Sequence, residues 1–394
     1  MVPVFTNVKL YICDTDALKG SLVKTLRKAR PTLSVAVPRL YEKMAESIQA
    51  FVNSATGIKK AIINWAMRIG YEACMTREYG KTYRKPWGYT LADKLVFHTV
   101  REKIGFDQCR GLVVSAAPVN IETLRFFAHF DIAIYDLLGQ SEGTAPFSTN
   151  SYVDNIWKLG SGGLPMPGVV VKTGDMDELM YRGRNVMMGY LKMEEETKRA
   201  LDADGWLHTG DQGRVDEDGF VYLTGRLKEL IVTSGGENVS PVPIENKLME
   251  LCPQISNVIV IGDKRNYLSC MFCLKTVADP TSGNPTQALD PSVIEKGKTF
   301  GSESTTCEQA SQDEKWHDYL GTIIEKYNEE SAVSNAQKIR KWIVLKNDIS
   351  LGKGELTATM KMKRGVIMKN YEEEIKGIYE NEVAAKSEAA KTTV

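Results

Sequence analysis

No apolar run in this 394-residue sequence reaches the about 18 residues that a membrane-spanning helix requires. The first residues, Met1–Leu10, also lack the basic start and apolar core of a secretory signal. We therefore expect a protein without transmembrane segments that is soluble or bound at a membrane surface.

The sequence has no excess of charge of either sign, since 50 Lys and Arg residues balance 50 Asp and Glu residues. Proteins that bind nucleic acid depend on a basic excess, so nucleic acid is not an expected partner. Cysteine is also sparse, and seven irregularly spaced residues predict reduced thiols rather than a disulfide framework. Cys270 and Cys273 form a C-x-x-C, for which a metal or redox role is the alternative. Their apolar surroundings, Tyr267–Leu274, favour two buried positions in a strand.

The pattern of apolar residues divides the chain into three regions. In residues 1–149, β-rich runs alternate with helical patterns, which predicts a parallel α/β sheet. Residues 150–226 are rich in Gly and Pro and predict an antiparallel, barrel-like β module. Residues 227–394 predict a separate α+β domain, in which the polar segment 276–315 is expected to be a surface excursion. The β-rich runs of the first region are Thr32–Val37, Gly111–Ser115 and Ile132–Leu138.

The most informative segment is Asp204–Pro241, DGWLHTGDQGRVDEDGFVYLTGRLKELIVTSGGENVSP. Its local pattern alone indicates two hairpins joined by a polar link. The whole string, however, is similar to the signature of the adenylate-forming (AMP-binding) superfamily, which includes fatty acyl-CoA synthetases. The resemblance implies that Asp211 binds the ribose hydroxyls of ATP and that Arg226 binds the ribose or a phosphate. It also implies that Lys228 is the hinge of a mobile C-terminal domain, with a solvated loop lysine as the alternative.

The segment Leu137–Gly143, LLGQSEG, resembles a second motif of the superfamily. There Ser141 would contact phosphate and Glu142 would take a catalytic role by coordinating Mg²⁺. A single carboxylate suffices because this hard ion is shared with the phosphates of the substrate. Leu138 stands where the family places an aromatic residue against adenine, so stacking would be lost.

Three further segments extend the resemblance. Ser115, Ala116 and Ala117 resemble the small-residue loop beside adenine, although a turn that ends the strand is the alternative. Gly235 and Gly236 would lie near a channel for coenzyme A. The segment GELTATMKMKR at Gly354–Arg364 resembles the end of long-chain and very-long-chain acyl-CoA synthetases of the bubblegum type. Lys361 would be the lysine that stabilises charge during adenylation, with Lys363 as its competitor and a solvated basic face as the alternative.

The fold predicted by this resemblance is the remnant of a multi-layered adenylate-forming large domain, followed by a mobile C-terminal domain. The predicted activity is that of an ATP-dependent long-chain fatty acid–CoA ligase that uses ATP, Mg²⁺ and coenzyme A. The expected location is the cytoplasm, with possible peripheral contact with the endoplasmic reticulum or another membrane. The Ser/Thr/Gly-rich loop ending in Pro-Lys-Gly does not occur in the sequence. We therefore expect a truncated, inactive synthetase, or alternatively a non-catalytic remnant that binds nucleotide weakly or pairs with a partner chain.

Overall fold

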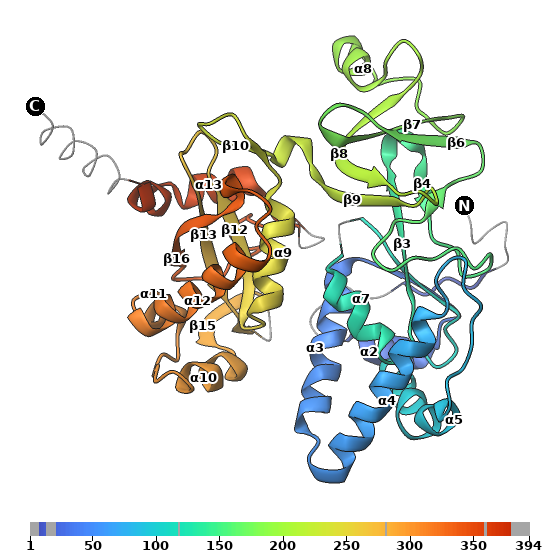
Figure 1. Ribbon diagram of the computed structural model, residues 1–394, viewed down its shortest axis with the longest axis horizontal. Coiled ribbons are helices and arrows are strands. Elements are labelled where there is room, and N and C mark those ends of the chain that lie inside the picture. Colours follow the sequence, from blue (N-terminus) through green and yellow to red (C-terminus); the bar gives the residue numbers. More distant parts are fainter. Residues whose placement is uncertain (1–7, 13–20, 117–118, 280–281, 358–360, 380–394) are drawn as a thin grey trace, which may run out of the picture. The chain divides into compact units, whose positions relative to one another are not determined.

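The computed structural model describes residues 8–12, 21–116, 119–279, 282–357 and 361–379 (Figure 1). The chain divides into two compact units, Met1–Leu223 and Thr224–Val394. The division lies next to the expected boundary at residues 226–227. Within the described residues no helix is both long enough and apolar enough to cross a membrane.

The first unit is built on a sheet with strand order β1-β2-β3-β4-β5 in the described part of the chain. β1 (Leu33–Ala36), β2 (Gly111–Val114) and β3 (Ile134–Gln140) run parallel, as the alternating pattern predicts. β4 (Ala145–Thr149) and β5 (Leu164–Pro165) then extend the sheet in the antiparallel sense. The predicted parallel sheet is therefore confirmed, and the antiparallel strands β4 and β5 continue the same sheet.

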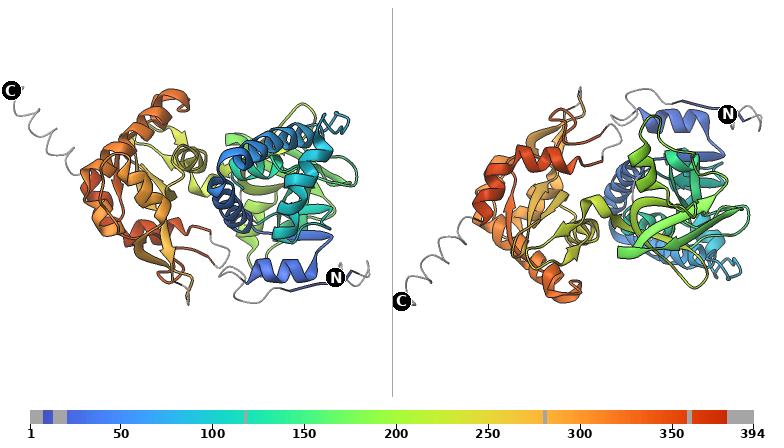
Figure 2. Two further views of the ribbon diagram at one scale, coloured as in Figure 1. Left: turned by 90° about the horizontal axis from the view of Figure 1, so that it is seen from below. Right: turned by 90° about the horizontal axis from the view of Figure 1, so that it is seen from above.

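Helices connect the parallel strands because their apolar residues recur every three or four positions. In α4, the buried residues Ile63, Ala66, Ile69, Gly70 and Ala73 form one stripe. α5 continues through a π-helical stretch at Asp93–Phe97 into α6. In Figure 2 the helices of residues 38–104 lie in front of the strands of residues 169–226 when the unit is seen from below, and behind them when it is seen from above. The helices are α2 (Leu22–Ala29), α3 (Pro38–Ser54), α4 (Gly57–Met75), α5 (Tyr89–Ala92), α6 (His98–Ile104) and α7 (Ile121–Ala128).

Asp136 is an acidic residue in the middle of β3, where its side chain is only 8% exposed. Burial raises the pKa of its carboxyl group to about 8, although a hydrogen bond from the backbone of Leu137 acts in the opposite direction. The folded chain thus binds a proton that the unfolded chain releases near pH 4. This group therefore stabilises the fold at low pH, and the contribution is lost as the pH rises towards 8.

We expect Asp136→Asn to remove this pH dependence, because an amide does not ionise. The free energy of unfolding of the wild-type chain should fall by up to about 1.4 kcal/mol per pH unit between about pH 5 and 8 through this group alone. Urea unfolding at pH 5 and pH 8 measures the difference, with the exposed Asp204→Asn as the matched control. Equal pH slopes for the wild type and Asp136→Asn would contradict the burial argument.

An antiparallel sheet with the order β6-β7-β8-β9 forms the second part of the first unit, as described. Leu179 and Tyr181 alternate inward along β7 and pack with Phe147, Leu207 and Val221. The antiparallel module is thus present as a sheet, whereas its barrel-like closure stays a prediction. Its elements are β6 (Val169–Thr173), β7 (Glu178–Gly183), α8 (Glu194–Ala200), β8 (Leu207–Val215) and β9 (Val221–Arg226).

The second unit contains a three-stranded sheet within the described residues, with the order β12-β13-β16. β12 (Ile255–Ile261) pairs antiparallel with β13 (Leu268–Leu274), and β13 pairs parallel with β16 (Ile339–Val344). Cys270 and Cys273 are fully buried in β13, which confirms the strand interpretation of the C-x-x-C. The unit also contains β10 (Ile231–Val232), β11 (Asn238–Val239), α9 (Pro241–Leu251), α12 (Glu314–Glu330) and α13 (Arg364–Asn370).

The prediction of a surface excursion at residues 276–315 is wrong. This segment forms β14 (Thr276–Ala278), β15 (Pro285–Leu289), α10 (Pro291–Lys298) and α11 (Cys307–Ser311). Leu289, Val293 and Cys307 from this segment are buried in the core of the second unit. The segment is mostly polar, so its few apolar residues gave no clear periodic pattern in the sequence. These apolar residues nevertheless pack into the core of the second unit and hold the segment there.

Candidate active site

Two of the predicted motifs meet at the carboxyl edge of the parallel sheet. β2 ends at Val114 and leads into Ser115, while β3 leads into a short 3₁₀ turn at Ser141–Gly143. The Ser115 hydroxyl donates to the carbonyl oxygen of Leu137 at 3.4 Å, which ties the two strand ends together. Open α/β sheets bind ligands at this edge. Ala117 lies outside the described residues.

Ala116 has a backbone conformation that few non-glycine residues adopt. Its φ is +76°, in the left-handed region, and its side chain is exposed at the end of β2. This conformation costs roughly 1–2 kcal/mol for an L-residue, and such strain clusters at functional sites. The finding supports the interpretation of Ser115 and Ala116 as a small-residue loop rather than an ordinary strand ending.

Glu142 is held by its backbone and by its side chain. Its carbonyl oxygen accepts from the amide of Met187 at 2.7 Å, and its Oε1 accepts from the hydroxyl of Tyr190 at 2.8 Å. The hydrogen bond to Glu142 raises the pKa of Tyr190. Tyr190 therefore orients the carboxylate, a role that the sequence analysis did not assign because 48 residues separate the pair.

β7 contacts the neighbour of Glu142 and pairs with β8, the strand that contains Asp211. A Cβ on Gly143, next to Glu142, would lie 2.0 Å from the hydroxyl of Tyr181, so only glycine fits there. In β8, Thr209 donates to the carbonyl oxygen of Leu179 at 2.6 Å, and its hydroxyl accepts from the Asp211 amide at 3.0 Å. Leu179 and Tyr181 are two positions apart on one strand. β7 therefore lies beside the backbone of both motifs, and the convergence of the two acidic side chains stays a prediction.

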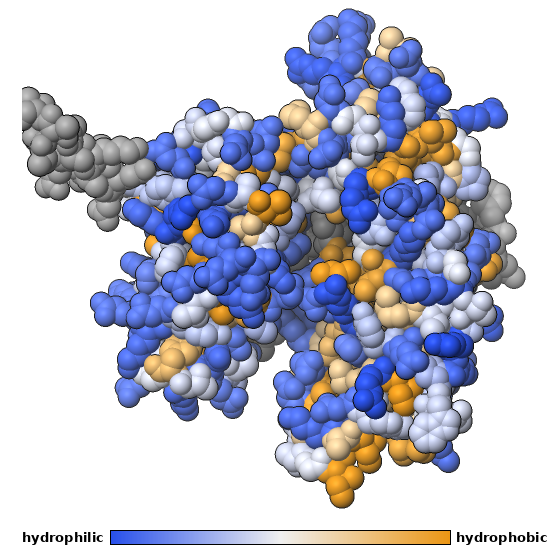
Figure 3. All heavy atoms as spheres, in the orientation of Figure 1, coloured by the Kyte–Doolittle hydropathy of each residue, from blue (hydrophilic) through white to orange (hydrophobic). Residues whose placement is uncertain are grey.

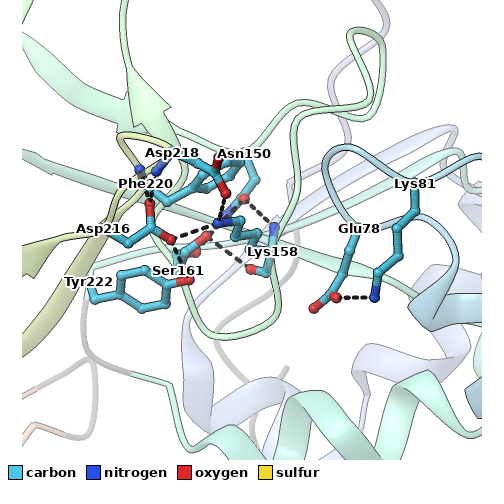
Figure 4. A network of polar contacts seen from close by, with 9 residues as sticks. All are labelled: Glu78, Lys81, Asn150, Lys158, Ser161, Asp216, Asp218, Phe220 and Tyr222. Atoms are coloured by element: carbon cyan, nitrogen blue, oxygen red, sulfur yellow. Dashed lines mark hydrogen bonds and ion pairs between the residues drawn. The ribbon is translucent and has the colours of Figure 1, made fainter.

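A lysine fastens the hairpin that carries Asp211 (Figure 4). Lys158 donates to Asp216 at 2.8 Å and to Asp218 at 2.5 Å, and its ammonium group lies 4.7 Å from the centre of the Phe220 ring. Burial disfavours its charge, but the hydrogen bonds with the two carboxylates raise the pKa of Lys158 overall. The two aspartates lie in the turn between β8 and β9, so the end of the Asp211 strand is locked in place.

The same hairpin is joined to β3 through a glycine-rich segment. The side-chain amide of Asn150 donates to the carbonyl oxygens of Asp136 and Ser161, as Figure 4 shows for Ser161 and Asn150 beside Lys158. Gly162 and Gly163 then exchange backbone hydrogen bonds with Val221. A Cβ on Gly163 would lie 1.9 Å from the carbonyl carbon of Thr149. These glycines thus allow close packing of β9 against β4.

Leu138 packs inside the first unit. A Cβ on Gly162 would lie 2.2 Å from its Cγ, and Leu138 also contacts the core of the antiparallel module. This packing accounts for a smaller residue at a position where the resemblance predicts an aromatic ring. Its effect on adenine binding stays a prediction.

The predicted hinge and glycine pair belong to the second unit. Arg226 and Lys228 are exposed, and Lys228 lies in a 3₁₀ turn at Leu227–Glu229. Gly235 and Gly236 lie in the exposed turn between β10 and β11, where the φ of Gly236 is +79°. Exposure agrees with roles in motion and ligand access, which stay predictions.

Lys361 lies in the part of the second unit that leads into α13. The amide of Lys361 donates to the hydroxyl of Thr357 at 3.0 Å, and its carbonyl oxygen accepts from the Thr357 amide at 2.8 Å. Leu356 and Met362 form the adjoining β-bridge. Lys363, the alternative, is exposed.

Arg364 anchors this segment to two distant glutamates. Its guanidinium forms an ion pair with Glu245 of α9 and lies 3.5 Å from Glu229, the neighbour of the predicted hinge Lys228. Glu245 is 2% exposed, and its other oxygen accepts from the Val260 amide at 2.7 Å. One buried arginine thus links the Lys361 segment, a core helix and the hinge turn, a role that the sequence analysis missed.

The described residues contain no cluster of three His, Cys, Asp or Glu side chains that could hold a metal ion by itself. Glu142 alone offers an oriented carboxylate next to Ser141. This donor set fits Mg²⁺ only when the ion is shared with the phosphates of a nucleotide.

Two family models match the chain. The model described as AMP-binding enzyme matches residues 1–191, and the model described as AMP-binding enzyme C-terminal domain matches residues 228–300. The matches flank the segment that contains Asp211 and Arg226.

Curated relatives align along nearly the whole chain. The long-chain-fatty-acid–CoA ligase ACSBG2 of Gallus gallus is 40% identical over 385 residues, which cover 96% of this chain and 50% of that relative. The long-chain-fatty-acid–CoA ligase ACSBG1 of Homo sapiens is 40% identical over 383 residues. These residues cover 95% of this chain and 52% of that relative. The chain thus spans about half the length of the curated relatives it matches.

Solved structures share the fold. The adenylation domain of a carboxylate reductase from Mycobacterium chelonae aligns with a TM-score of 0.62 and 17% identity, covering 94% of this chain and 49% of that chain. The A-PCP didomain of a carboxylic acid reductase from Segniliparus rugosus, solved in complex with AMP, also aligns with a TM-score of 0.62 and 17% identity. That alignment covers 97% of this chain and 46% of the didomain. At this identity the likeness concerns the fold.

Proposed function

Because the chain belongs to the AMP-binding enzyme family, we propose that it carries nucleotide-binding and acyl-activating residues of a long-chain fatty acid–CoA ligase. In the proposed reaction a fatty acid and ATP give an acyl-adenylate and pyrophosphate, and coenzyme A then displaces AMP. The observation that supports the proposal is that β7 contacts Gly143, the neighbour of Glu142, and also pairs with β8, the strand that contains Asp211. The separation of the two motifs in sequence makes this arrangement informative.

Each residue of the first unit has a role that its chemistry supports. Asp211 would accept hydrogen bonds from the two ribose hydroxyls, and charge-assisted bonds of this kind are strong. Ser141 would contact a phosphate, and Glu142, oriented by Tyr190, would hold Mg²⁺ on the phosphates. Ser115 and Ala116 would let the backbone approach the adenine ring.

The residues of the second unit would act in sequence. Adenylation brings a fatty acid carboxylate onto the α-phosphate, so two anions must approach each other. A positioned cation lowers that barrier, and Lys361 would supply it. Arg226 would bind the ribose or a phosphate. Rotation about Lys228 would then exchange Lys361 for a coenzyme A channel beside Gly235 and Gly236.

Nucleotide binding by the chain tests the proposal. We expect AMP to bind weakly, and Asp211→Asn to weaken it at least about tenfold, because hydrogen bonds to a charged group contribute about 1.5–3 kcal/mol. Asp204→Asn is the matched control, since Asp204 is exposed and lies seven positions earlier in the same signature. Titration with AMP monitored by NMR gives the dissociation constants. Equal affinities for the wild type and Asp211→Asn would contradict the assignment of the ribose site.

A second candidate function, pairing with a partner polypeptide, is supported by the edge of the parallel sheet. β1 pairs with β2 on one side, and its Val35 is 65% exposed. Strands of parallel sheets are normally covered on both faces. A separately expressed segment of the Gallus gallus relative, taken from the half that this chain does not match, should then co-elute with this chain. Independent elution would exclude this pairing.

A further inference from the structure

The segment between α4 and α5 is a loop whose two ends are hydrogen-bonded to one buried carboxylate. Arg77 at its start donates to both oxygens of Asp131, at 2.9 and 2.8 Å. Tyr89 at its end donates to Asp131 Oδ2 at 2.5 Å, and Tyr83 between them donates to the same atom at 3.3 Å. Asp131 is buried among them. These hydrogen bonds anchor the loop to the core of the first unit.

The tip of this loop, Arg84–Trp87, projects from that anchor. The hydroxyl of Thr76 accepts from the amide of Arg84 at 3.1 Å and donates to its carbonyl oxygen at 3.3 Å. Pro86 restricts the backbone, and its carbonyl oxygen accepts from the Tyr89 amide. Trp87 is nevertheless 93% exposed. A tryptophan exposed to solvent on an anchored loop is unusual, because removing its large apolar surface from water would lower the free energy.

Cationic side chains surround this tryptophan. Trp65 and Trp87 line a shallow depression of about 590 Å³ together with Arg68, Arg84 and Lys85. Within the described part of the chain these three cations form no ion pair, although the ammonium of Lys85 lies 4.8 Å from the centre of the Tyr89 ring. The remaining residues of the depression are Ile69, Glu72 and Pro86, so a single acidic group faces three basic ones.

Apolar side chains continue beyond the tip. Leu91 in α5 and Leu95 in the following π-helical stretch are exposed at four-residue spacing from Trp87. Figure 3 shows apolar surface interspersed with hydrophilic residues at the end of the first unit that α4 and α5 form. The loop thus combines an exposed aromatic ring, neighbouring leucines and unpaired cations.

We propose that this loop, residues 77–89, docks the protein on the surface of an anionic phospholipid bilayer. Tryptophan suits the bilayer interface because its ring has an apolar body and a polar N–H group. Arg68, Arg84 and Lys85 complement the phosphates of acidic headgroups, and each basic residue near such a surface is worth about 1 kcal/mol. The fixed loop loses little conformational freedom on docking. The inference is independent of the nucleotide site.

Vesicle binding tests the proposal with the full chain. We expect sucrose-loaded vesicles of phosphatidylcholine with 30% phosphatidylserine to sediment the protein, and vesicles of phosphatidylcholine alone to sediment much less. Trp87→Ala should lower the partition coefficient about tenfold, and the double variant Arg84→Gln/Lys85→Gln up to about 30-fold. Raising the salt concentration should release the protein. Acyl chains brominated near the headgroup should quench fluorescence in the wild type but much less in Trp87→Ala.

Two matched variants control for size and charge. Met188→Ala removes an apolar side chain that is 99% exposed elsewhere in the first unit. Lys24→Gln/Lys28→Gln removes two exposed charges from α2. Neither should change vesicle binding by more than about twofold. Absence of binding, or equal losses in control and loop variants, would overturn the proposal. So would a Trp87-dependent dimer in the absence of vesicles, which would assign the loop to a second copy of the chain.

Discussion

Lys361→Ala is expected to lower palmitate-dependent ATP–pyrophosphate exchange by about 10²–10³-fold, because a group that stabilises developing charge commonly contributes about 3–4 kcal/mol. The assay requires a phosphate loop, which this sequence lacks, so the chain is joined to the part of the Gallus gallus relative that lies outside the matched region. Lys363→Ala is the matched control. It removes an exposed lysine two positions away and should retain most of the activity.

The two half-reactions separate the role of Lys361 from a general loss of structure. Conversion of preformed palmitoyl-adenylate and coenzyme A to palmitoyl-CoA should be nearly unchanged in Lys361→Ala, since the lysine is proposed to act before the domain rotates. Equal loss in both half-reactions would indicate a structural role instead. The 394-residue chain alone is expected to form little or no palmitoyl-CoA, because the backbone donors of the phosphate loop are missing from its sequence. Robust turnover by this chain would show that the loop is dispensable.

Arg364→Met is expected to destabilise the second unit by about 3–5 kcal/mol, the usual cost of removing one partner of a buried ion pair. The guanidinium is 13% exposed and its partner Glu245 is 2% exposed, so truncation leaves a carboxylate buried without its cation. Hydrogen exchange of the amides in β12 and β13 reports on this unit within the intact chain. These amides should exchange at least about 100-fold faster in the variant.

Two further variants distinguish the ion pair of Arg364 with Glu245 from its ion pair with Glu229. Lys363→Met changes an exposed neighbour and should leave exchange in both strands unaltered. Glu229→Gln weakens only the ion pair between Arg364 and Glu229. The amides of β12 and β13 should therefore stay protected from exchange, while the amides near Lys228 and Lys361 should exchange faster. Unchanged exchange in Arg364→Met would show that the pair does not stabilise this unit.

The fold class and the family could be predicted from the sequence alone, because both depend on patterns of neighbouring residues. The parallel strands β1–β3 and the buried positions of Cys270 and Cys273 followed from runs of apolar residues. The motifs at Asp204–Pro241 and Leu137–Gly143 are contiguous strings, so their similarity to a family is visible without coordinates. The roles assigned to individual residues in them stay predictions. The folded segment at 276–315 was missed because its few apolar anchors are diluted by polar residues.

Only the tertiary structure decided which distant residues support these motifs. Arg364 and Glu245 are separated by 119 positions, Lys158 and Asp216 by 58, and Tyr190 and Glu142 by 48. Charged and hydroxyl side chains occur throughout the sequence, and no local pattern tells which of them will meet. The exposure of Trp87 was equally hidden, because an apolar aromatic residue is usually buried. It is exposed here because Arg77, Tyr83 and Tyr89 bind Asp131, beyond the end of α7, and so fix the course of the intervening loop.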